Sequence, residues 1–212
     1  MKPLMRSIRD SMEAATSTYE ADLEGSPAEE YLKGRGIDLA TAKDFRLGYV
    51  EKVLPGYEHV VGRLSIPNIC AAERVVGIKF RTITHEEPKY MKRSGDENRL
   101  WNLRALNDPN DIMFLCEGEL DALTLSILGV SAIAVQGATS FKEYHWRLLE
   151  DYRKVVNIRD LDKDGSELAF KLTATDLPVI IVEPPGGSHD VNQAWQDGRG
   201  DELLDLIEEV SK

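Results

Sequence analysis

Residues 112–123 read Ile-Met-Phe-Leu-Cys-Glu-Gly-Glu-Leu-Asp-Ala-Leu, and residues 155–165 read Val-Val-Asn-Ile-Arg-Asp-Leu-Asp-Lys-Asp-Gly. In each stretch an apolar run of strand length ends at a group of carboxylates. Open α/β sheets bind ligands at the carboxyl ends of their strands, so both groups are predicted to lie at that edge of one sheet. Carboxylates gathered there would repel one another. A hard cation such as Mg²⁺ would remove that repulsion and could serve phosphoryl transfer.

Strands and helices are predicted to alternate from about residue 105 onward. The strands are expected over 111–116, 132–135, 155–158 and 179–182, and the helices over 120–128, 141–151 and 166–174. This alternation predicts a mainly parallel sheet with helices on both faces, a Rossmann-like α/β fold. The first and third of these strands end at the two acidic groups.

The first half of the chain has a different pattern. Residues 1–25 are expected to form a helix or a loosely attached tail. Ser26 followed by Pro27 predicts a capped helix start, and Asp38 predicts a second, short helix over 39–45. Strand-like runs at 62–67 and 75–81 then complete a small α+β subdomain. We expect this subdomain at 26–105, the α/β domain at 106–195 and an acidic C-terminal helix at 196–212.

Charge and composition limit the classes of function. The formal net charge of -11 argues against a protein that coats nucleic acid by bulk electrostatics, because neutralising phosphates requires excess Lys and Arg, but it leaves local binding open. No apolar run approaches the roughly 20 residues of a membrane helix, and the N-terminus lacks the apolar segment of a signal peptide. We therefore expect a cytoplasmic protein without membrane contact.

The cysteines and histidines offer no structural zinc site. Cys70 and Cys116 are the only two cysteines, and they form no CxxC pair or Cys/His cluster. They are expected to be buried free thiols. His59, His85 and His145 show no ligand spacing and receive no role.

The motif order resembles the TOPRIM domain shared by DnaG-type primases, type IA and type II topoisomerases and some nucleases. The stretch 117–121, Glu-Gly-Glu-Leu-Asp, is similar to the primase form of the first motif. The stretch 160–165, Asp-Leu-Asp-Lys-Asp-Gly, is similar to the DxDxxG of the second. His189-Asp190-Val-Asn192 is similar to a third acidic element. Six short blocks of the first half resemble, in order, the N-terminal subdomain of the DnaG-type RNA polymerase core: 28–37, 45–49, 62–67, 76–81, 88–91 and 100–103.

This resemblance implies a set of site residues. Its catalytic acids would be Glu117, Asp160 and Asp162, with Glu117 also a candidate base for an attacking 3′-hydroxyl. The ligands of Mg²⁺ or Mn²⁺ would be Glu117, Asp121, Asp160, Asp162, Asp190 and Asn192.

From the residues alone, the acids are also compatible with solvated turns and helix-capping carboxylates. Asp190 and Asn192 could instead form an Asx turn, and Asp164 suits either a ligand or a turn. The helical spacing directs Glu119 away from the site, so we expect its side chain in solvent.

A basic group near an aromatic side chain lies in the first half of the chain. It consists of Arg63, Lys79, Arg81, Lys89 and Tyr90. Such a group can hold a template backbone or an incoming triphosphate, with Tyr90 stacked on a base. Scattered surface charge is the alternative.

The resemblance implies a DNA primase core that makes RNA primers from ribonucleoside triphosphates on single-stranded DNA. Primases of this type carry a zinc-binding domain before the core, which we do not find here. We therefore expect a minimal, phage-like form acting in the host cytoplasm, with a replicative helicase or a zinc-bearing primase subunit as partner. Two alternatives stay open: a TOPRIM nuclease, whose usual ATPase motif GxxxxGK[ST] is missing, and a non-catalytic module that recruits a helicase or partner primase subunit.

Overall fold

The computed structural model describes residues 5–93, 95–137 and 140–212. The chain divides into two compact units, Met1–Glu97 and Asn98–Lys212. The first four residues of the expected N-terminal segment lie outside the described residues.

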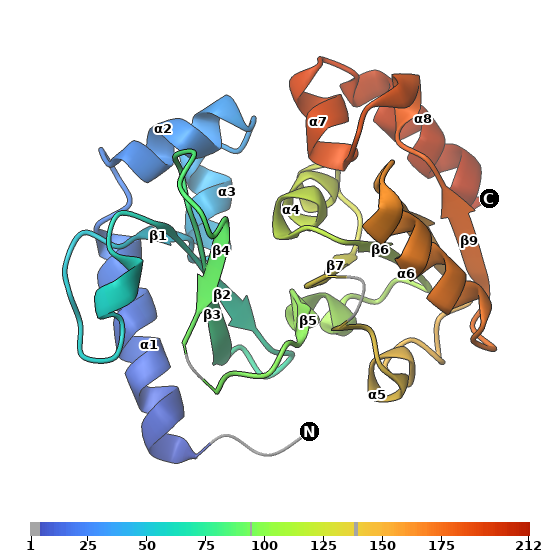
Figure 1. The fold of residues 1–212 in the computed structure, drawn as a ribbon. Helices are drawn as coiled ribbons and strands as arrows, with labels where there is room; N and C mark the ends of the chain where they lie inside the picture. The colour runs from blue at the N-terminus through green and yellow to red at the C-terminus, as the bar shows by residue number, and fades with distance from the viewer. Residues whose placement is uncertain (1–4, 94, 138–139) are drawn as a thin grey trace. The chain divides into compact units, whose positions relative to one another are not determined.

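The first unit is an antiparallel sheet with three helices (Figure 1). Its helices are α1 (Arg6–Ala21), α2 (Pro27–Gly34) and α3 (Leu39–Asp44), and a 3-10 turn, η1, spans Glu58–Val60. Its strands β1 (Gly48–Tyr49), β2 (Leu64–Ile69), β3 (Val75–Arg81) and β4 (Tyr90–Lys92) are hydrogen-bonded in that order. The expected α+β character of this half is confirmed.

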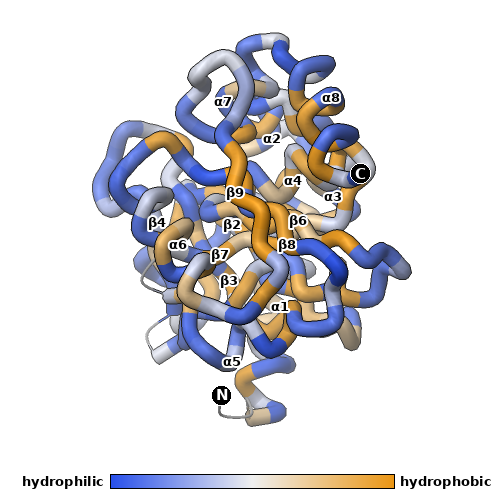
Figure 2. Tube along the Cα trace, turned by 90° about the vertical axis from the view of Figure 1, so that its right-hand side faces the viewer, coloured by the Kyte–Doolittle hydropathy of each residue, from blue (hydrophilic) through white to orange (hydrophobic). Residues whose placement is uncertain are grey.

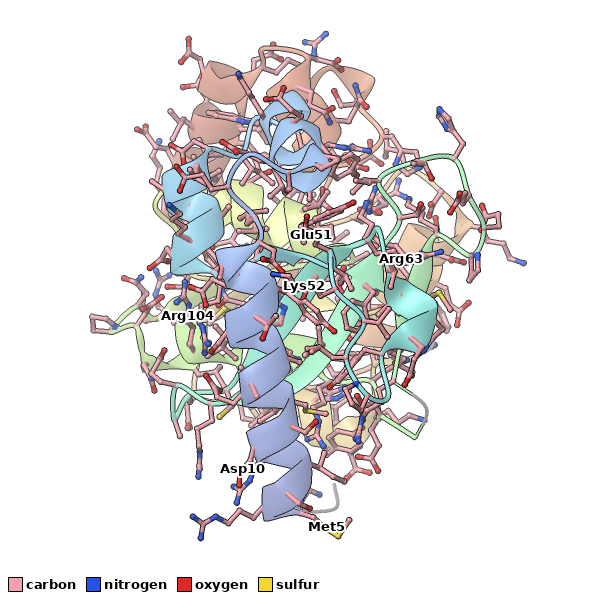
Figure 3. All side chains as sticks on the ribbon, turned by 90° about the vertical axis from the view of Figure 1, so that its left-hand side faces the viewer. Met5, Asp10, Glu51, Lys52, Arg63 and Arg104 are labelled. Atoms are coloured by element: carbon pink, nitrogen blue, oxygen red, sulfur yellow. The ribbon has the colours of Figure 1, made fainter. Side chains whose placement is uncertain are left out.

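Helix caps and a close backbone approach position the elements of this unit. The Ser26 hydroxyl accepts the N–H groups of the first turn of α2, and the Asp38 carboxylate accepts one from α3, as predicted. A Cβ on Gly48 would lie 2.4 Å from the carbonyl carbon of Tyr19, so only glycine fits where β1 passes the end of α1. Lys52, labelled in Figure 3, pairs with Asp22 next to that helix end, with 3.3 Å between Nζ and Oδ1.

The core of the first unit lies between α1 and the sheet. Met12, Ala15 and Tyr19 of α1 cluster with Ile78 and Phe80 of β3. The rings of Tyr19, Tyr57 and Phe80 meet edge to face, with centroids 5.7–6.1 Å apart.

The second unit is built on a five-stranded sheet of order β5-β7-β6-β8-β9, parallel except for β5. Its strands are β5 (Leu100–Trp101), β6 (Ile112–Cys116), β7 (Ala132–Val135), β8 (Lys154–Ile158) and β9 (Val179–Val182). Its helices are α4 (Glu119–Ile127), α5 (Glu143–Trp146), α6 (Lys163–Thr173), α7 (Val191–Gln196) and α8 (Gly200–Ser211), with 3-10 turns η2 (Leu103–Asn107) and η4 (Pro185–Gly187).

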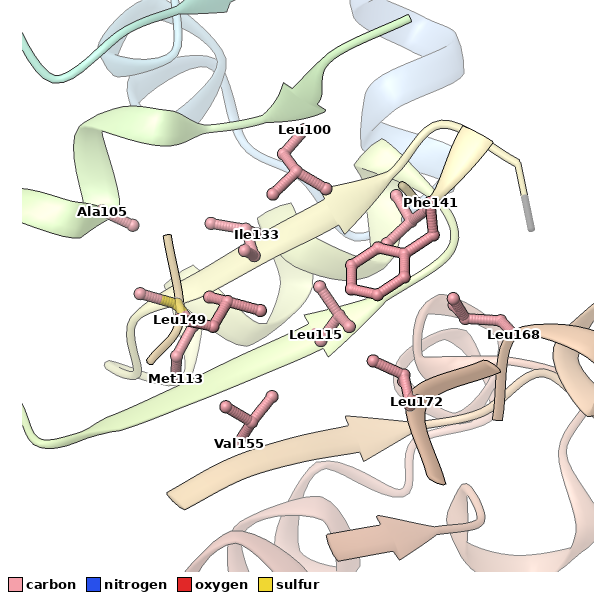
Figure 4. Packing of buried hydrophobic residues seen from close by; sticks show 11 residues of the cluster. Leu100, Ala105, Met113, Leu115, Ile133, Phe141, Leu149, Val155, Leu168 and Leu172 are labelled. Carbon is pink, nitrogen blue, oxygen red and sulfur yellow. The ribbon is translucent and has the colours of Figure 1, made fainter. Parts of the chain in front are cut away.

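Helices cover both faces of this sheet. Met113 and Leu115 of β6 and Val155 of β8 belong to one buried cluster with Leu149 and with Leu168 and Leu172 of α6 (Figure 4). Helix α4 contacts β6, β7 and α7, and α8 packs on α7. Strand β9, at the edge of the sheet, is apolar along its length (Figure 2), but its residues are only partly buried and Ile180 is exposed. The expected α/β class with helices on both faces is thereby confirmed.

Three expectations are corrected. The helix expected over 141–151 is limited to α5, because the chain after it tightens into i→i+3 turns such as Leu149 N–H to Trp146 O at 2.8 Å, which bring Leu149 into the core. Helix α6 begins earlier than expected because Asp162 caps it. Cys116 is a buried free thiol as predicted, but Cys70 is only partly buried.

Among the helices of the described residues, none combines the length and the apolar character that a membrane span requires.

Candidate active site

Both acidic groups lie at the carboxyl edge of the parallel sheet. Glu117 directly follows β6, and Asp160 comes two residues after the end of β8, the strand that pairs with β6 through Leu115 and Asn157. From β6 the chain crosses to β7 on one side and then returns to β8 on the other (Figure 1). This is the topological switch point at which open α/β sheets bind ligands.

Gly165 brings the two groups together. A Cβ at this position would lie 2.2 Å from the backbone oxygen of Asp160 and 2.8 Å from Glu117 Oε1, so the first turn of α6 fits between them only as glycine. The Asp162 side chain caps this turn by accepting the Gly165 N–H at 2.8 Å. The DxDxxG pattern is therefore a loop and helix start that places Glu117 beside the Asp160–Asp162 segment.

The carboxylate of Glu117 lies among other carboxylates, which do not compensate its negative charge. Its Oε1 is buried and accepts no hydrogen bond within the part of the chain that the structure describes. Burial, together with the nearby carboxylates of Asp162 and Asp164, raises the pKa of Glu117 to about 7. An oxygen in this state is stabilised by a proton or a cation.

Asp121 reaches back to the same region from one turn into α4. A Cβ on Gly118 would lie 2.3 Å from Asp121 Oδ2, and Asp121 Oδ1 accepts the Asn192 N–H at 2.8 Å. Burial, then the charges of Asp190 and Asp160, raises the pKa of Asp121 well above its usual value. The first and third motifs are thus joined by a buried hydrogen bond.

Asn192 makes most of its contacts inside the protein. Its Nδ2 donates to Thr124 Oγ1 at 3.0 Å, and its Oδ1 accepts from Gln196 Nε2 at 3.0 Å. The side chain is 2% exposed and locks α7 onto α4. A role for it as an outer metal ligand stays a prediction.

The third motif meets the second through His189 and Asp190. The Leu161 N–H donates to His189 O at 2.8 Å, and His189 Nε2 lies 3.5 Å from Asp162 Oδ2. Asp160, His189 and Asp190 each offer an atom that lies within 4.8 Å of the others. Sequence reasoning gave His189 no role, although its place directly before Asp190 in the third motif was the available signal.

Glu119 and Asp164 lie close to the motifs in sequence, but one is buried and the other is exposed. Glu119 is 0% exposed, so the expectation of a solvated side chain is wrong. The reason is that α4 is buried on every side from Glu119 to Leu125, where β6, β7 and α7 contact it. Asp164 is exposed in the first turn of α6 and contributes charge near Glu117.

The set of donors fits a hard divalent cation. Asp160 after β8 and His189 and Asp190 before α7 offer ligand atoms within 4.8 Å of one another. Glu117 is not part of that group, but its buried, unbonded Oε1 lies across the first turn of α6 from the Asp160 backbone oxygen. Oxygen-rich sites of this kind suit Mg²⁺ and Mn²⁺.

The basic group lies in the first unit and gathers around Tyr90. The Tyr90 ring lies 4.0 Å from Lys79 Nζ, 5.7 Å from Lys89 Nζ and 5.1 Å from Arg81 Cζ. Lys89 is exposed. Lys79, Lys89 and Tyr90 form a positively charged, aromatic surface, with buried Arg81 next to the ring.

The two arginines of this group are buried. Arg81 donates through Nε to Tyr31 OH at 2.7 Å and through a second nitrogen to Tyr90 OH. Arg63 donates to the Pro88 carbonyl at 2.8 Å. Both side chains are held inside the protein, so they are better placed to support the surface than to contact a ligand. The contribution of Tyr31 was missed, because α2 and β3 are distant in sequence.

The chain is similar in sequence to a known protein family and to several known proteins. Residues 114–195 match the Toprim-like family. The Gene 57 protein of Mycobacterium phage D29 is 35% identical over 133 residues, which cover 63% of this chain and 87% of that protein. A DNA primase of Pseudomonas aeruginosa is 24% identical over 210 residues, covering 79% of this chain and 32% of the primase.

A solved structure of the DnaG primase catalytic domain bound to single-stranded DNA has the same fold. Its TM-score is 0.81 at 20% identity, with 96% of this chain and 78% of that chain covered. The chain therefore spans most of the phage protein but only about a third of the length of the bacterial primase.

Proposed function

This chain belongs to the family of DnaG-type primase catalytic cores, and on that premise we propose that it synthesises RNA primers from ribonucleoside triphosphates on single-stranded DNA. The observation that carries the proposal is that Asp160 clusters with His189 and Asp190 at one edge of the Toprim-like sheet, while Gly165 lets Glu117 lie beside the Asp160 backbone. The single-stranded DNA in the related catalytic-domain structure supports the choice of template.

Members of this family depend on a metal ion. Here Glu117, Asp160 and Asp190 would hold Mg²⁺ or Mn²⁺, with Asp121 and Asp162 beside them. When bound, the cation supplies positive charge that neutralises the triphosphate and the negative charge developing during transfer. The chain's own contribution is to fix these carboxylates on strand ends and helix starts, which are rigid supports.

Glu117 is the candidate general base. Its buried Oε1 accepts no hydrogen bond within the described residues, and burial with the neighbouring carboxylates raises its pKa to about 7 when no cation is bound, so it is more basic than an ordinary glutamate and could accept a proton from a primer 3′-hydroxyl. Asp162 is held by its cap to α6, so it orients the loop that carries Asp160. Asp121, held by the Asn192 N–H, fixes the third motif against the first.

The surface around Tyr90 would contact the template or the incoming triphosphate. Lys79 and Lys89 supply positive charge, and Tyr90 supplies a ring on which a base can stack. Arg81, bonded to two tyrosine hydroxyls, would hold Tyr90 in place. A replicative helicase or a zinc-bearing primase subunit is proposed as partner because the resemblance to DnaG-type primases implies it.

Extension of a supplied primer tests the activity without requiring initiation. The chain is mixed with labelled ribonucleotides, Mg²⁺ or Mn²⁺, and a short RNA annealed to single-stranded DNA. Glu117→Gln is compared with Glu150→Gln, a matched change at an exposed glutamate. We expect extension by the unaltered chain and Glu150→Gln but not by Glu117→Gln. Absence of extension by the unaltered chain would instead favour the non-catalytic module, and cleavage of the template would favour the nuclease.

A further inference from the structure

His189 lies between the second and third acidic motifs. Its Nδ1 is 3.4 Å from Asp190 Oδ2, and its Nε2 is 3.5 Å from Asp162 Oδ2. Both distances are longer than a normal hydrogen bond, so neither carboxylate holds the ring tightly. The imidazole is 54% exposed and is therefore open to an incoming ion.

The backbone of this segment is held on both sides. On one side, the His189 carbonyl accepts the Leu161 N–H at 2.8 Å. On the other, the turn η4 has left-handed Gly186 and Gly187, and a Cβ on Gly186 would lie 2.2 Å from the Arg199 guanidinium. The loop that carries His189 is therefore tightly constrained, and it places the imidazole beside Asp162 and Asp190.

An imidazole changes the cation preference of an otherwise all-oxygen site. Mg²⁺ is a hard ion that prefers carboxylates and water, whereas imidazole nitrogen suits later transition metals. Mn²⁺ is served by carboxylates and tolerates a nitrogen ligand better than Mg²⁺ does. Asp160 and Asp190 each present an oxygen within 4.8 Å of a His189 nitrogen, a separation that one ion between them can bridge.

We propose that His189 is a nitrogen ligand of the cation in this site and that it shifts the site's preference from Mg²⁺ towards Mn²⁺. The inference rests on the divalent-cation site of the proposed function and adds to it the identity of one ligand and the resulting selectivity.

Electron spin-echo spectroscopy of bound Mn²⁺ tests the ligand directly, because a coordinated imidazole produces a ¹⁴N modulation that carboxylates do not. The unaltered chain is compared with His189→Ala and with His85→Ala, a matched change at an exposed histidine of the first unit. Calorimetric titrations with Mn²⁺ and with Mg²⁺ accompany the spectra.

We expect the ¹⁴N modulation in the unaltered chain and in His85→Ala, and its loss in His189→Ala. His189→Ala should weaken Mn²⁺ binding by about tenfold or more and Mg²⁺ binding by less than about threefold. Bound Mn²⁺ without ¹⁴N modulation in the unaltered chain would overturn the inference and leave the carboxylate site intact; that spectrum needs no variant, so it decides even if His189→Ala does not fold. Failure of the unaltered chain to bind either ion would overturn the cation site of the proposed function as well.

Discussion

Replacing Gly165 with alanine should damage both the fold and the cation site, although the same change inside a helix is ordinarily favourable. Gly165 lies in the first turn of α6, where alanine would by itself gain about 0.5–1 kcal/mol over glycine. Here the new Cβ would lie 2.2 Å from the backbone oxygen of Asp160 and 2.8 Å from Glu117 Oε1.

The size of the effect follows from these two contacts. The Asp160 oxygen belongs to the backbone and cannot rotate away, so α6 or the 160–162 loop must move by about 1 Å to restore normal contact. Overpacking of this kind costs about 1–3 kcal/mol, which exceeds the helix gain. A 1 Å displacement of reacting groups can cost about 10²-fold in rate. We therefore expect net destabilisation of about 1–2 kcal/mol and loss of most nucleotide addition.

Urea denaturation and Mn²⁺ titration measure the two effects, with Gly34→Ala as the control. Gly34 ends α2 with ordinary backbone angles, and no atom lies within 4 Å of the position that a Cβ would take there, so that variant should keep its stability and cation affinity. A Gly165→Ala chain as stable as its parent, with unchanged Mn²⁺ affinity, would refute the placement of Glu117 beside the 160–162 loop.

Four further outcomes are expected. Glu117→Gln should lower nucleotide addition by about 10²-fold or more while retaining the circular dichroism spectrum; activity within about tenfold of the parent would make Glu117 a bystander. Lys89→Ala should reduce the salt dependence of single-stranded DNA binding by about one unit of slope in fluorescence anisotropy, and an unchanged slope would move the DNA surface elsewhere. Burial lowers the pKa of His145 to about 4, so below the ordinary histidine pKa of 6.5 the unfolded chain binds a proton that the folded chain does not. The free energy of unfolding should therefore fall by about 2 kcal/mol from pH 7 to pH 5. His145→Phe should remove that part of the pH dependence in urea titrations, and identical profiles would contradict it. Gly48→Ala should destabilise the first unit by about 1–3 kcal/mol in thermal unfolding, because its Cβ would meet the backbone of Tyr19, and an unchanged midpoint would refute that close approach.

Features that depend on local patterns were predictable from the sequence. The strands at 75–81, 132–135 and 179–182 have the expected bounds, because short runs rich in Val and Ile between polar or turn residues are strong signals. The caps by Ser26 and Asp38 follow from residue type and position. Glu117 and Asp160 could be placed at one edge because parallel strands bring their carboxyl ends together.

Features that depend on what packs against an element were not predictable. Helical spacing indicates where Glu119 points relative to Asp121, but not that neighbouring elements bury that side of α4. Tyr31 and Arg81 are 50 residues apart in sequence, so their hydrogen bond forms only once α2 lies against the sheet. His189 is a candidate ligand only because folding brings it close to Asp162, a residue of another motif.

Anomalous scattering from crystals of the chain equilibrated with Mn²⁺ tests the central claim most directly, since it locates the ion without relying on activity. The account predicts a Mn²⁺ peak within about 2.5 Å of carboxylate oxygens of Glu117, Asp160 or Asp190, at the carboxyl ends of β6 and β8. No peak there at saturating Mn²⁺, or peaks only at other surface carboxylates, would contradict the claim that the three acidic motifs form one cation site.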